Sequence, residues 1–309
     1  MKVLLTGGSG FIGAWIVRAL LRAGHGVRIF DQRDDRTIVT QVVGETVDDE
    51  AIEWFIGDIT DADQVLEASG ECDAVIHLAG VLTPFCAAHP MQGARVNVLG
   101  TLNIFEAARV RRWGVVAYAS SAGVFGPENP GIPDPRTLYG VYKLACEGIA
   151  RCYWEESSPE LRVASIGLRP LVVYGVGRSG GSSAGPSLAC RAAVLGESYT
   201  IPFSGSTGFV YVEDVADAFI KCAFSRVSGA HVCNMAGTVA GVDEFVAAVT
   251  DAVPDARLSI SGLPLPIAAR IEGGDVRELL PDVASTSIEE GIRKTLACYQ
   301  RLRERRAGD

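Results

Sequence analysis

The chain has 309 residues, of which 48% are hydrophobic, so it can bury one large core or two unequal ones. Its formal charge of −9 at pH 7 argues against nucleic acid and anionic membrane as partners, and it has no run of about 18 apolar residues for a membrane span. The eight cysteines and four histidines lack metal-ligand spacing, so we expect no metal site, reduced thiols and a cytoplasmic protein.

Short apolar segments alternate with helical patterns through most of the chain. We expect strands at residues 2–6, 26–31, 53–61, 73–80, the start of 114–126 (which runs into a loop), 161–175, the start of 209–224, and 230–237. We expect helices at residues 10–24, 61–70, 93–112, 138–156 and the rest of 209–224. Residues 176–187 are rich in glycine and serine and indicate a loop, and the chain after residue 242 has a helical pattern with short strand-like pieces.

This order predicts an α/β fold, a Rossmann-type doubly wound parallel sheet with helices on both faces. A smaller C-terminal α/β subdomain is expected to bind the substrate. We predict a dinucleotide-binding domain at residues 1–175, to which residues 209–237 return. Residues 176–208 and 238–309 then form the substrate-binding subdomain.

Three glycines, Gly7, Gly10 and Gly13, separate the first strand from the first helix. Glycine there permits a tight turn, a close approach of backbone to a pyrophosphate and close helix–sheet packing, while the helix N-terminus favours the phosphates. Asp31 ends the next strand, 18 residues after Gly13, where a carboxylate accepts hydrogen bonds from the adenosine ribose. The pattern predicts a dinucleotide site, and Asp31 favours NAD over NADP, although Arg33 and Arg36 partly offset its charge.

Tyr139 and Lys143 lie four residues apart in a predicted helix and therefore share one face. An ammonium beside a phenol stabilises the phenolate, which suits proton transfer to and from a hydroxyl. Ser121 follows a predicted strand and is expected to hydrogen-bond the same substrate oxygen. Ser120 is the competing serine, expected to contact cofactor or backbone, and Tyr142 is expected to point away.

Together these motifs resemble the extended short-chain dehydrogenase/reductase superfamily, and within it the NAD-dependent epimerase/dehydratase family, with its nucleotide-sugar 4-epimerases. The matching segments cover nearly all of residues 1–225 and include Asp31 and the Tyr139–Lys143 pair. The others are TGGSGFIG, GDITD, VIHLAG, NVLGTLNIFEAA, SSAGVFG, LRPLVVYG and FVYVEDVADA.

The resemblance implies further roles by position. It implies a general acid/base at Tyr139, a ribose contact at Lys143, and a homodimer formed through residues 97–109 and 139–154. The implied or assigned cofactor-binding residues are Gly7, Gly10, Phe11, Ile12, Gly13, Asp31, Arg33, Asp58, Ile59, Leu78, Ala79, Gly80, Asn97, Ala119, Ser120, Tyr139, Lys143 and Val172. The substrate-binding residues are Thr83, Ser121, Tyr139 and Arg178.

The chain departs from the nucleotide-sugar pattern at several positions. Val172 stands where an asparagine is usual, Thr207 and Gly208 replace an Arg-Asp pair, and Leu82 lies where many 4-epimerases have a lysine. Without the usual side chains at these positions, the diphosphate of a nucleotide sugar lacks hydrogen-bond donors in the site. Arg178 or Arg277 can supply donors in their place. Alternatively, the loop at residues 177–186 takes a smaller polyol or sugar.

The expected reaction is a hydride transfer to NAD from a carbinol carbon of a small-molecule carbohydrate, while Tyr139 manages the hydroxyl proton. We favour epimerisation of a sugar or sugar nucleotide, as in a UDP-glucose 4-epimerase. One alternative is an NAD(P)-dependent dehydrogenase of a non-nucleotide sugar, polyol or hydroxy acid. An alternative of another class is a regulator that senses the dinucleotide without turnover. Dehydration is disfavoured because no acidic pair follows Ser120.

Overall fold

The computed structural model describes residues 1–44 and 51–308 and has a seven-stranded parallel sheet at its centre. The sheet order is β10-β6-β5-β4-β1-β2-β3, so the direction of winding reverses between β1 and β4. This confirms the predicted doubly wound α/β fold. The strands are β1 (Lys2–Thr6), β2 (Gly26–Asp31), β3 (Ile52–Ile56), β4 (Ala74–His77), β5 (Val116–Ala119), β6 (Ser165–Pro170) and β10 (Ala230–Met235).

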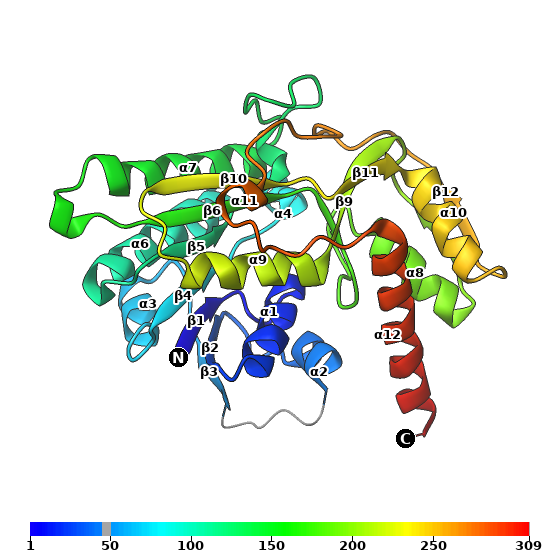
Figure 1. The fold of residues 1–309 in the computed structure, drawn as a ribbon, viewed down its shortest axis with the longest axis horizontal. Helices are drawn as coiled ribbons and strands as arrows, with labels where there is room; N and C mark the ends of the chain where they lie inside the picture. Colours follow the sequence, from blue (N-terminus) through cyan, green and yellow to red (C-terminus); the bar gives the residue numbers. More distant parts are fainter. Residues whose placement is uncertain (45–50, 309) are drawn as a thin grey trace.

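Helices cover both faces of this sheet because its strands carry apolar side chains on both sides (Figure 1). Val3 and Leu5 belong to one buried cluster, and Leu4 between them belongs to the other. The first cluster includes residues of α1 (Phe11–Arg22), α2 (Thr37–Val43) and α9 (Val212–Phe224). The second includes residues of α3 (Ala62–Ala68), α6 (Gly100–Arg111) and α7 (Leu138–Glu155).

The smaller part lies to the right in Figure 1 and contains two short sheets. One joins β7 (Val172–Tyr174), β9 (Ser206–Tyr211) and β11 (Thr238–Gly241); the other joins β8 (Ser198–Ile201) and β12 (Arg257–Ile260). Its helices are α8 (Gly185–Leu195), α10 (Val242–Ala252) and α12 (Ile288–Gly308), while α11 (Val276–Leu279) lies against β10 of the large sheet. The subdomain boundaries proposed from the sequence remain a prediction.

Two predicted elements are divided in the structure. The prediction of a single strand at residues 161–175 is wrong. Strand β6 ends at Pro170, and Val172–Tyr174 form β7, which pairs with β9 in the three-stranded sheet. The helix expected at 93–112 consists of the end of α5 (Pro90–Ala94), a π-helical turn (Arg95–Leu99) and α6. The short helices α2 and α4 (Thr83–Ala88) were not predicted.

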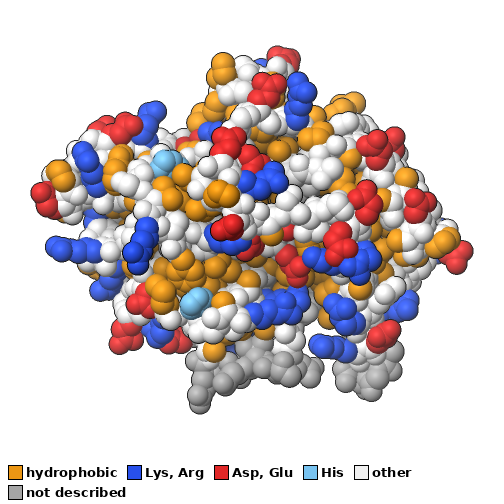
Figure 2. All heavy atoms as spheres, in the orientation of Figure 1, with side chains coloured by type: hydrophobic (Ala, Val, Ile, Leu, Met, Phe, Trp, Pro, Cys, Tyr) orange, Lys and Arg blue, Asp and Glu red, His pale blue; other side chains and the backbone are white. Residues whose placement is uncertain are grey.

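The surface carries charged side chains of both signs, interspersed with hydrophobic ones on the face that Figure 2 shows. In the part of the chain that the structure describes, no helix combines the length and apolar character needed to cross a membrane. All eight cysteines are free thiols.

Candidate active site

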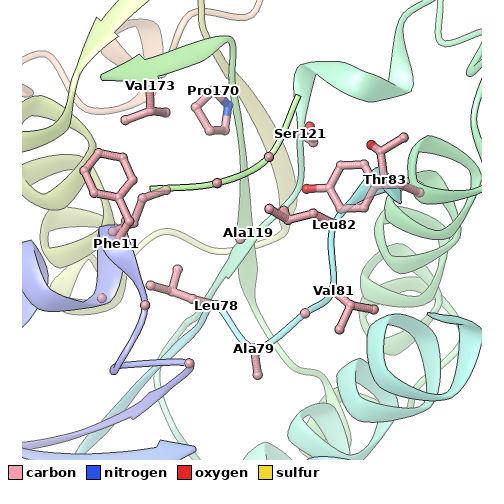
Figure 3. A pocket seen from close by; sticks show the side chains of 18 of the residues that line it. Phe11, Leu78, Ala79, Val81, Leu82, Thr83, Ala119, Ser121, Pro170 and Val173 are labelled. Carbon is pink, nitrogen blue, oxygen red and sulfur yellow. The ribbon is translucent and has the colours of Figure 1, made fainter. Parts of the chain in front are cut away.

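A cavity of about 730 Å³ lies at the carboxyl edge of the central sheet, within the size range of small-molecule sites. Its lining comes from the segments that follow β1, β2, β3, β4 and β5, from β7, and from the loop between β7 and α8. In Figure 3, Phe11 and Val173 lie on one side of it and Ser121, Leu82 and Thr83 on the other. Parallel sheets bind ligands at this edge and at this reversal of strand order.

Two glycines between β1 and the first turn of α1 leave no room for a side chain. Gly7 has a φ of +71°, and a Cβ added there lies 2.8 Å from the backbone nitrogen of Ala79. A Cβ on Gly13 lies 2.6 Å from the carbonyl oxygen of Gly7. Gly10 is the N-cap of α1, so the first unpaired N–H groups of that helix follow it at the cavity wall. This bare cradle at a helix N-terminus suits a pyrophosphate.

Asp31 lies at the end of β2 and lines the cavity. Its Oδ2 accepts hydrogen bonds from the backbone nitrogen of Ser9, at 3.2 Å, and from the Ser9 hydroxyl, while Oδ1 accepts one from the Gln32 nitrogen at 2.8 Å. The carboxylate is thereby fixed at the cavity wall, and its contact with an adenosine ribose remains a prediction. Arg33 is exposed and outside the described lining, and Arg36 pairs with Asp34.

All but two of the predicted cofactor-binding residues line the cavity, the exceptions being Arg33 and Asn97. The predicted substrate-binding residues line it as well. Their individual roles remain predictions. The residues brought together in this way are Gly7, Gly10, Phe11, Ile12, Gly13, Asp31, Asp58, Ile59, Leu78, Ala79, Gly80, Thr83, Ala119, Ser120, Ser121, Tyr139, Lys143, Val172 and Arg178.

Tyr139 and Lys143 project from the first turns of α7, which Thr137 caps by accepting a 3.1 Å hydrogen bond from the Gly140 nitrogen. Lys143 is only 4% exposed; its Nζ donates to the Ala119 carbonyl at 2.8 Å and lies 5.8 Å from the centre of the Tyr139 ring. The ammonium is thus anchored beside the phenol. Tyr142 donates to the Pro90 carbonyl at 2.9 Å, away from this pair, as predicted.

Ser121 caps the 3₁₀ turn after β5, where its Oγ accepts a hydrogen bond from the Gly123 nitrogen at 3.0 Å. Because that bond uses the oxygen as an acceptor, the hydroxyl proton remains available to a ligand oxygen in the cavity. Ser120 differs: it is buried and donates to the Glu147 carboxylate rather than to backbone.

The sequence analysis missed a buried ion pair directly behind these serines. Arg169, from β6, donates from Nε and Nη2 to the Glu147 carboxylate at 2.7 and 2.6 Å, with both side chains largely buried. Glu147 also accepts the Ser120 hydroxyl, so the pair joins β5, α7 and β6. The one available signal was that Glu147 follows Lys143 by four residues and shares its helix face.

Asn97 lies on the π-helical turn and is almost fully buried. Its Nδ2 donates to the Gly93 and Val81 carbonyls at 3.0 and 3.1 Å. Its Oδ1 has no hydrogen-bond partner among the described residues and lies 2.7 Å from where a Cβ on Gly80 would be. Asn97 therefore supports the backbone of the Gly80 segment from behind, without lining the cavity.

His77 is a buried strand residue, not part of the cavity wall. Its Nδ1 lies 2.7 Å from the Thr6 hydroxyl and its Nε2 lies 3.2 Å from the Thr101 hydroxyl. Burial, and to a smaller extent the charge of Lys143, lowers the pKa of His77 to about 3. The imidazole is therefore neutral at physiological pH.

The two arginines considered as diphosphate ligands lie in different places. Arg178 lines the cavity, with hydrogen bonds to the Val173 carbonyl and the Ser183 hydroxyl. Arg277 lies on α11 outside that lining, and its Nε donates to Asp275 at 2.8 Å. The suggestion that Arg277 replaces a missing diphosphate ligand is therefore wrong.

One protein family and several individual proteins are similar to this chain. The family described as NAD dependent epimerase/dehydratase matches residues 3–236. A UDP-glucose 4-epimerase of Mycolicibacterium smegmatis is 29% identical over 97% of this chain and 99% of its own, and one of Neisseria meningitidis serogroup C is 30% identical over 86% and 84%. The solved UDP-glucose 4-epimerase of Thermus thermophilus, in complex with NAD, is 25% identical with a TM-score of 0.78, covering 97% of this chain and 99% of that one.

Proposed function

The chain belongs to the NAD-dependent epimerase/dehydratase family, and from this premise we propose that it epimerises a hydroxyl-bearing carbon of a nucleotide sugar, as a UDP-glucose 4-epimerase does. One observation carries the proposal: a single cavity is lined both by the glycine cradle and by Tyr139, Lys143 and Ser121. The relatives that match over most of their length are named for this reaction.

The residues of the cavity fit NAD. Gly7, Gly10 and Gly13 leave the helix N-terminus bare for a pyrophosphate, and Asp31 offers its carboxylate to the adenosine ribose. A carboxylate at that position disfavours the extra phosphate of NADP. When bound, NAD supplies the carbon that accepts a hydride and returns it.

The proton chemistry falls to Tyr139, Lys143 and Ser121. The phenolate of Tyr139 takes the proton of the reacting hydroxyl, and the phenol so formed returns it. The adjacent ammonium of Lys143 stabilises the phenolate before the proton is taken and after it is returned. Ser121 donates its free hydroxyl proton to the same substrate oxygen. Thr83 and Arg178 are proposed to contact the rest of the substrate.

The test is a product assay with purified protein, NAD and UDP-glucose. We expect UDP-galactose to form until the two sugars reach a constant ratio, with no net accumulation of NADH. Absence of any interconversion under conditions where NAD binds would contradict the proposal.

A second candidate is a net dehydrogenase of a non-nucleotide sugar, polyol or hydroxy acid. It is favoured by the small number of cations at the site, since Lys143 and Arg178 are the only Lys or Arg side chains in the described lining. The same assay with sugars, polyols and hydroxy acids in place of UDP-glucose distinguishes the two reactions, because a dehydrogenase accumulates NADH in proportion to product and an epimerase does not.

We further propose a cytoplasmic homodimer. The helices expected at the interface expose large apolar side chains, with Val110 on α6 61% exposed and Val141 on α7 46% exposed. The eight free thiols agree with a reducing compartment. Sedimentation at micromolar concentration tests the assembly, and a monomer mass would contradict it.

A further inference from the structure

The end of β5 is held against α7 at two successive residues. The Ala119 carbonyl accepts a 2.8 Å hydrogen bond from Nζ of Lys143, and the next residue, Ser120, donates its hydroxyl to the Glu147 carboxylate. Lys143 and Glu147 lie about one helical turn apart on the same face of α7. One contact alone would let the strand end pivot on the helix, whereas two successive contacts fix its position.

The Glu147 carboxylate is itself oriented from behind by Arg169 of β6, the strand next to β5. Nε of Arg169 donates to Oε1 at 2.7 Å, and Nη2 donates to Oε2 at 2.6 Å. The two side chains are only 13% and 6% exposed, so water competes little for these bonds. A two-point contact of this kind fixes the plane of a carboxylate. The oxygen that accepts the Ser120 hydroxyl, Oε1, therefore has a fixed position.

Arg169 also contacts the loop that carries Ser121. Its guanidinium carbon lies 4.9 Å from the centre of the Phe125 ring, which is almost fully buried. Between these two points, Ser121 caps the 3₁₀ turn Ala122–Val124. The ion pair thus holds this loop at its start, through Ser120, and at its end, through Phe125.

The groups held in this way are those assigned to the proton chemistry. Ala119 and Ser121 both line the cavity and lie at its wall in Figure 3. The Ala119 carbonyl anchors the Lys143 ammonium 5.8 Å from the centre of the Tyr139 ring, and the effect of a charge on a neighbouring group falls with distance. A shift of the strand end would therefore move both the ammonium and the Ser121 hydroxyl, and misplacement by about 1 Å can lower a rate about 100-fold.

We propose that Glu147 is a positioning residue that acts through the Ser120 hydroxyl. Oriented by Arg169, it holds the end of β5 where the strand backbone anchors Lys143 and presents Ser121 to the cavity. The proposal rests on the proposed function, because the groups that it positions are those of the proposed proton transfer. It gives the Ser120 hydroxyl a role other than the cofactor contact considered from the sequence.

The first readout is the chemical reactivity of Lys143 in the presence of saturating NAD. The chain has four lysines, and competitive labelling with acetic anhydride followed by mass spectrometry gives the reaction rate of each. Ser120→Ala removes the link to β5 and leaves the ion pair of Glu147 intact. We expect Lys143 to react severalfold faster relative to Lys221, which pairs with Asp217, because the Lys143 amine loses a fixed acceptor. A general loosening of the fold would accelerate both lysines.

The second readout is epimerisation at saturating NAD and UDP-glucose. We expect Ser120→Ala to lower kcat about 10- to 100-fold and to leave the KM for UDP-glucose within a few-fold of wild type. Ser120→Thr keeps the hydroxyl and should recover most of the rate and most of the protection of Lys143. Unchanged kcat or unchanged Lys143 reactivity in Ser120→Ala would overturn the proposal, as would equal changes in the alanine and threonine variants. A defect confined to NAD affinity, with wild-type kcat at saturation, would also overturn it and make the hydroxyl a cofactor ligand.

Ser165→Ala is the matched control, since it also removes a buried serine hydroxyl from a strand of the same sheet. The Ser165 hydroxyl has no hydrogen-bond partner in the part of the chain that the structure describes, so kcat and lysine reactivity should stay at wild-type values. If Ser120→Ala does not fold, Glu147→Gln decides, because it keeps the side-chain shape and replaces charge-assisted hydrogen bonds with weaker ones. Faster labelling of Lys143 relative to Lys221 then supports the proposal, and wild-type reactivity overturns it.

Lysine labelling needs no turnover, so the two proposals can fail separately. If the wild type does not epimerise, the proposed function fails, and the reactivity of Lys143 in Ser120→Ala alone decides the positioning role. If the wild type epimerises and Ser120→Ala matches it in kcat and in Lys143 reactivity, the proposed function stands and the positioning role fails.

Discussion

At the scale of single residues, the position of Tyr139 depends on the glycine that follows it. A Cβ on Gly140 would lie 2.1 Å from the carbonyl oxygen of Gly123, in the loop that carries Ser121. Helix α7 approaches that loop closely enough for Tyr139 and Ser121 to face one cavity only because this Cβ is missing.

Gly140→Ala should therefore destabilise the protein by about 1–3 kcal/mol through overpacking and also lower activity. Gly148→Ala is the control on the same helix, where nothing lies within 4 Å of the added Cβ. It should leave activity unchanged and add about 0.5–1 kcal/mol of stability, since alanine favours helix more than glycine does. Urea denaturation measures the change in stability and a turnover assay measures the change in activity. Equal changes in Gly140→Ala and Gly148→Ala would contradict this explanation.

His77 makes stability depend on pH. Its pKa is about 3 in the folded chain against an ordinary value near 6.5. The unfolded chain thus binds a proton first, and stability is lost as pH falls below about 6.5 toward 3, by up to about 1.4 kcal/mol per pH unit. Between pH 6.5 and 5 we expect His77 to contribute about 2 kcal/mol of that loss.

The measurement compares urea denaturation at pH 6.5 and 5 for the wild type and His77→Gln. The variant is expected to be less stable at both pH values but to lose about 2 kcal/mol less between them. Exposed His89→Gln is the control and should keep the wild-type pH dependence. An unchanged pH dependence in His77→Gln would show that the buried imidazole is not the source.

At the scale of elements, the ion pair between Glu147 and Arg169 ties α7 to β6, while the Ser120 hydroxyl ties β5 to both. Glu147→Leu leaves a largely buried guanidinium unpaired and should cost about 3–5 kcal/mol. The double variant Glu147→Leu with Arg169→Met should recover much of that loss, because no unpaired charge remains. Denaturation of Glu147→Leu, of Arg169→Met and of the double variant gives the coupling energy between the two side chains, and additive losses of stability would contradict this coupling.

The positions of helices and strands were predicted better from the sequence than the strand pairings and side-chain contacts between them. Alternating strands and helices, the glycine spacing and the Tyr139–Lys143 spacing are local patterns, and the structure brings these residues to one cavity. The break at Pro170 was missed because residues 161–175 are mostly apolar on both sides of it and the sheet that receives Val172–Tyr174 is completed by β9, far along the chain. The Glu147–Arg169 pair was missed for the same reason, since its two halves come from different elements.

At the scale of the whole molecule, the cavity lies where the large sheet meets the smaller part. The chain leaves β6 at Pro170 and enters β7, whose Tyr174 packs against Phe209 and Phe245 with ring centres 6.4 and 5.2 Å apart. This aromatic cluster holds β7, β9 and α10 together within the smaller part. The loop that carries Arg178 follows directly, which brings this arginine to a cavity lined mainly by the first half of the chain.

The central claim is that Tyr139 carries the proton of the reacting hydroxyl at an NAD site. The most direct test is the ratio of epimerisation rates of Tyr139→Phe and wild type, with Tyr142→Phe, whose hydroxyl bonds the Pro90 carbonyl, as the matched control. We predict a loss of about 10²–10⁴-fold for Tyr139→Phe and a rate within a few-fold of wild type for Tyr142→Phe. A Tyr139→Phe protein that keeps its fold and turns over within a few-fold of wild type would contradict the claim.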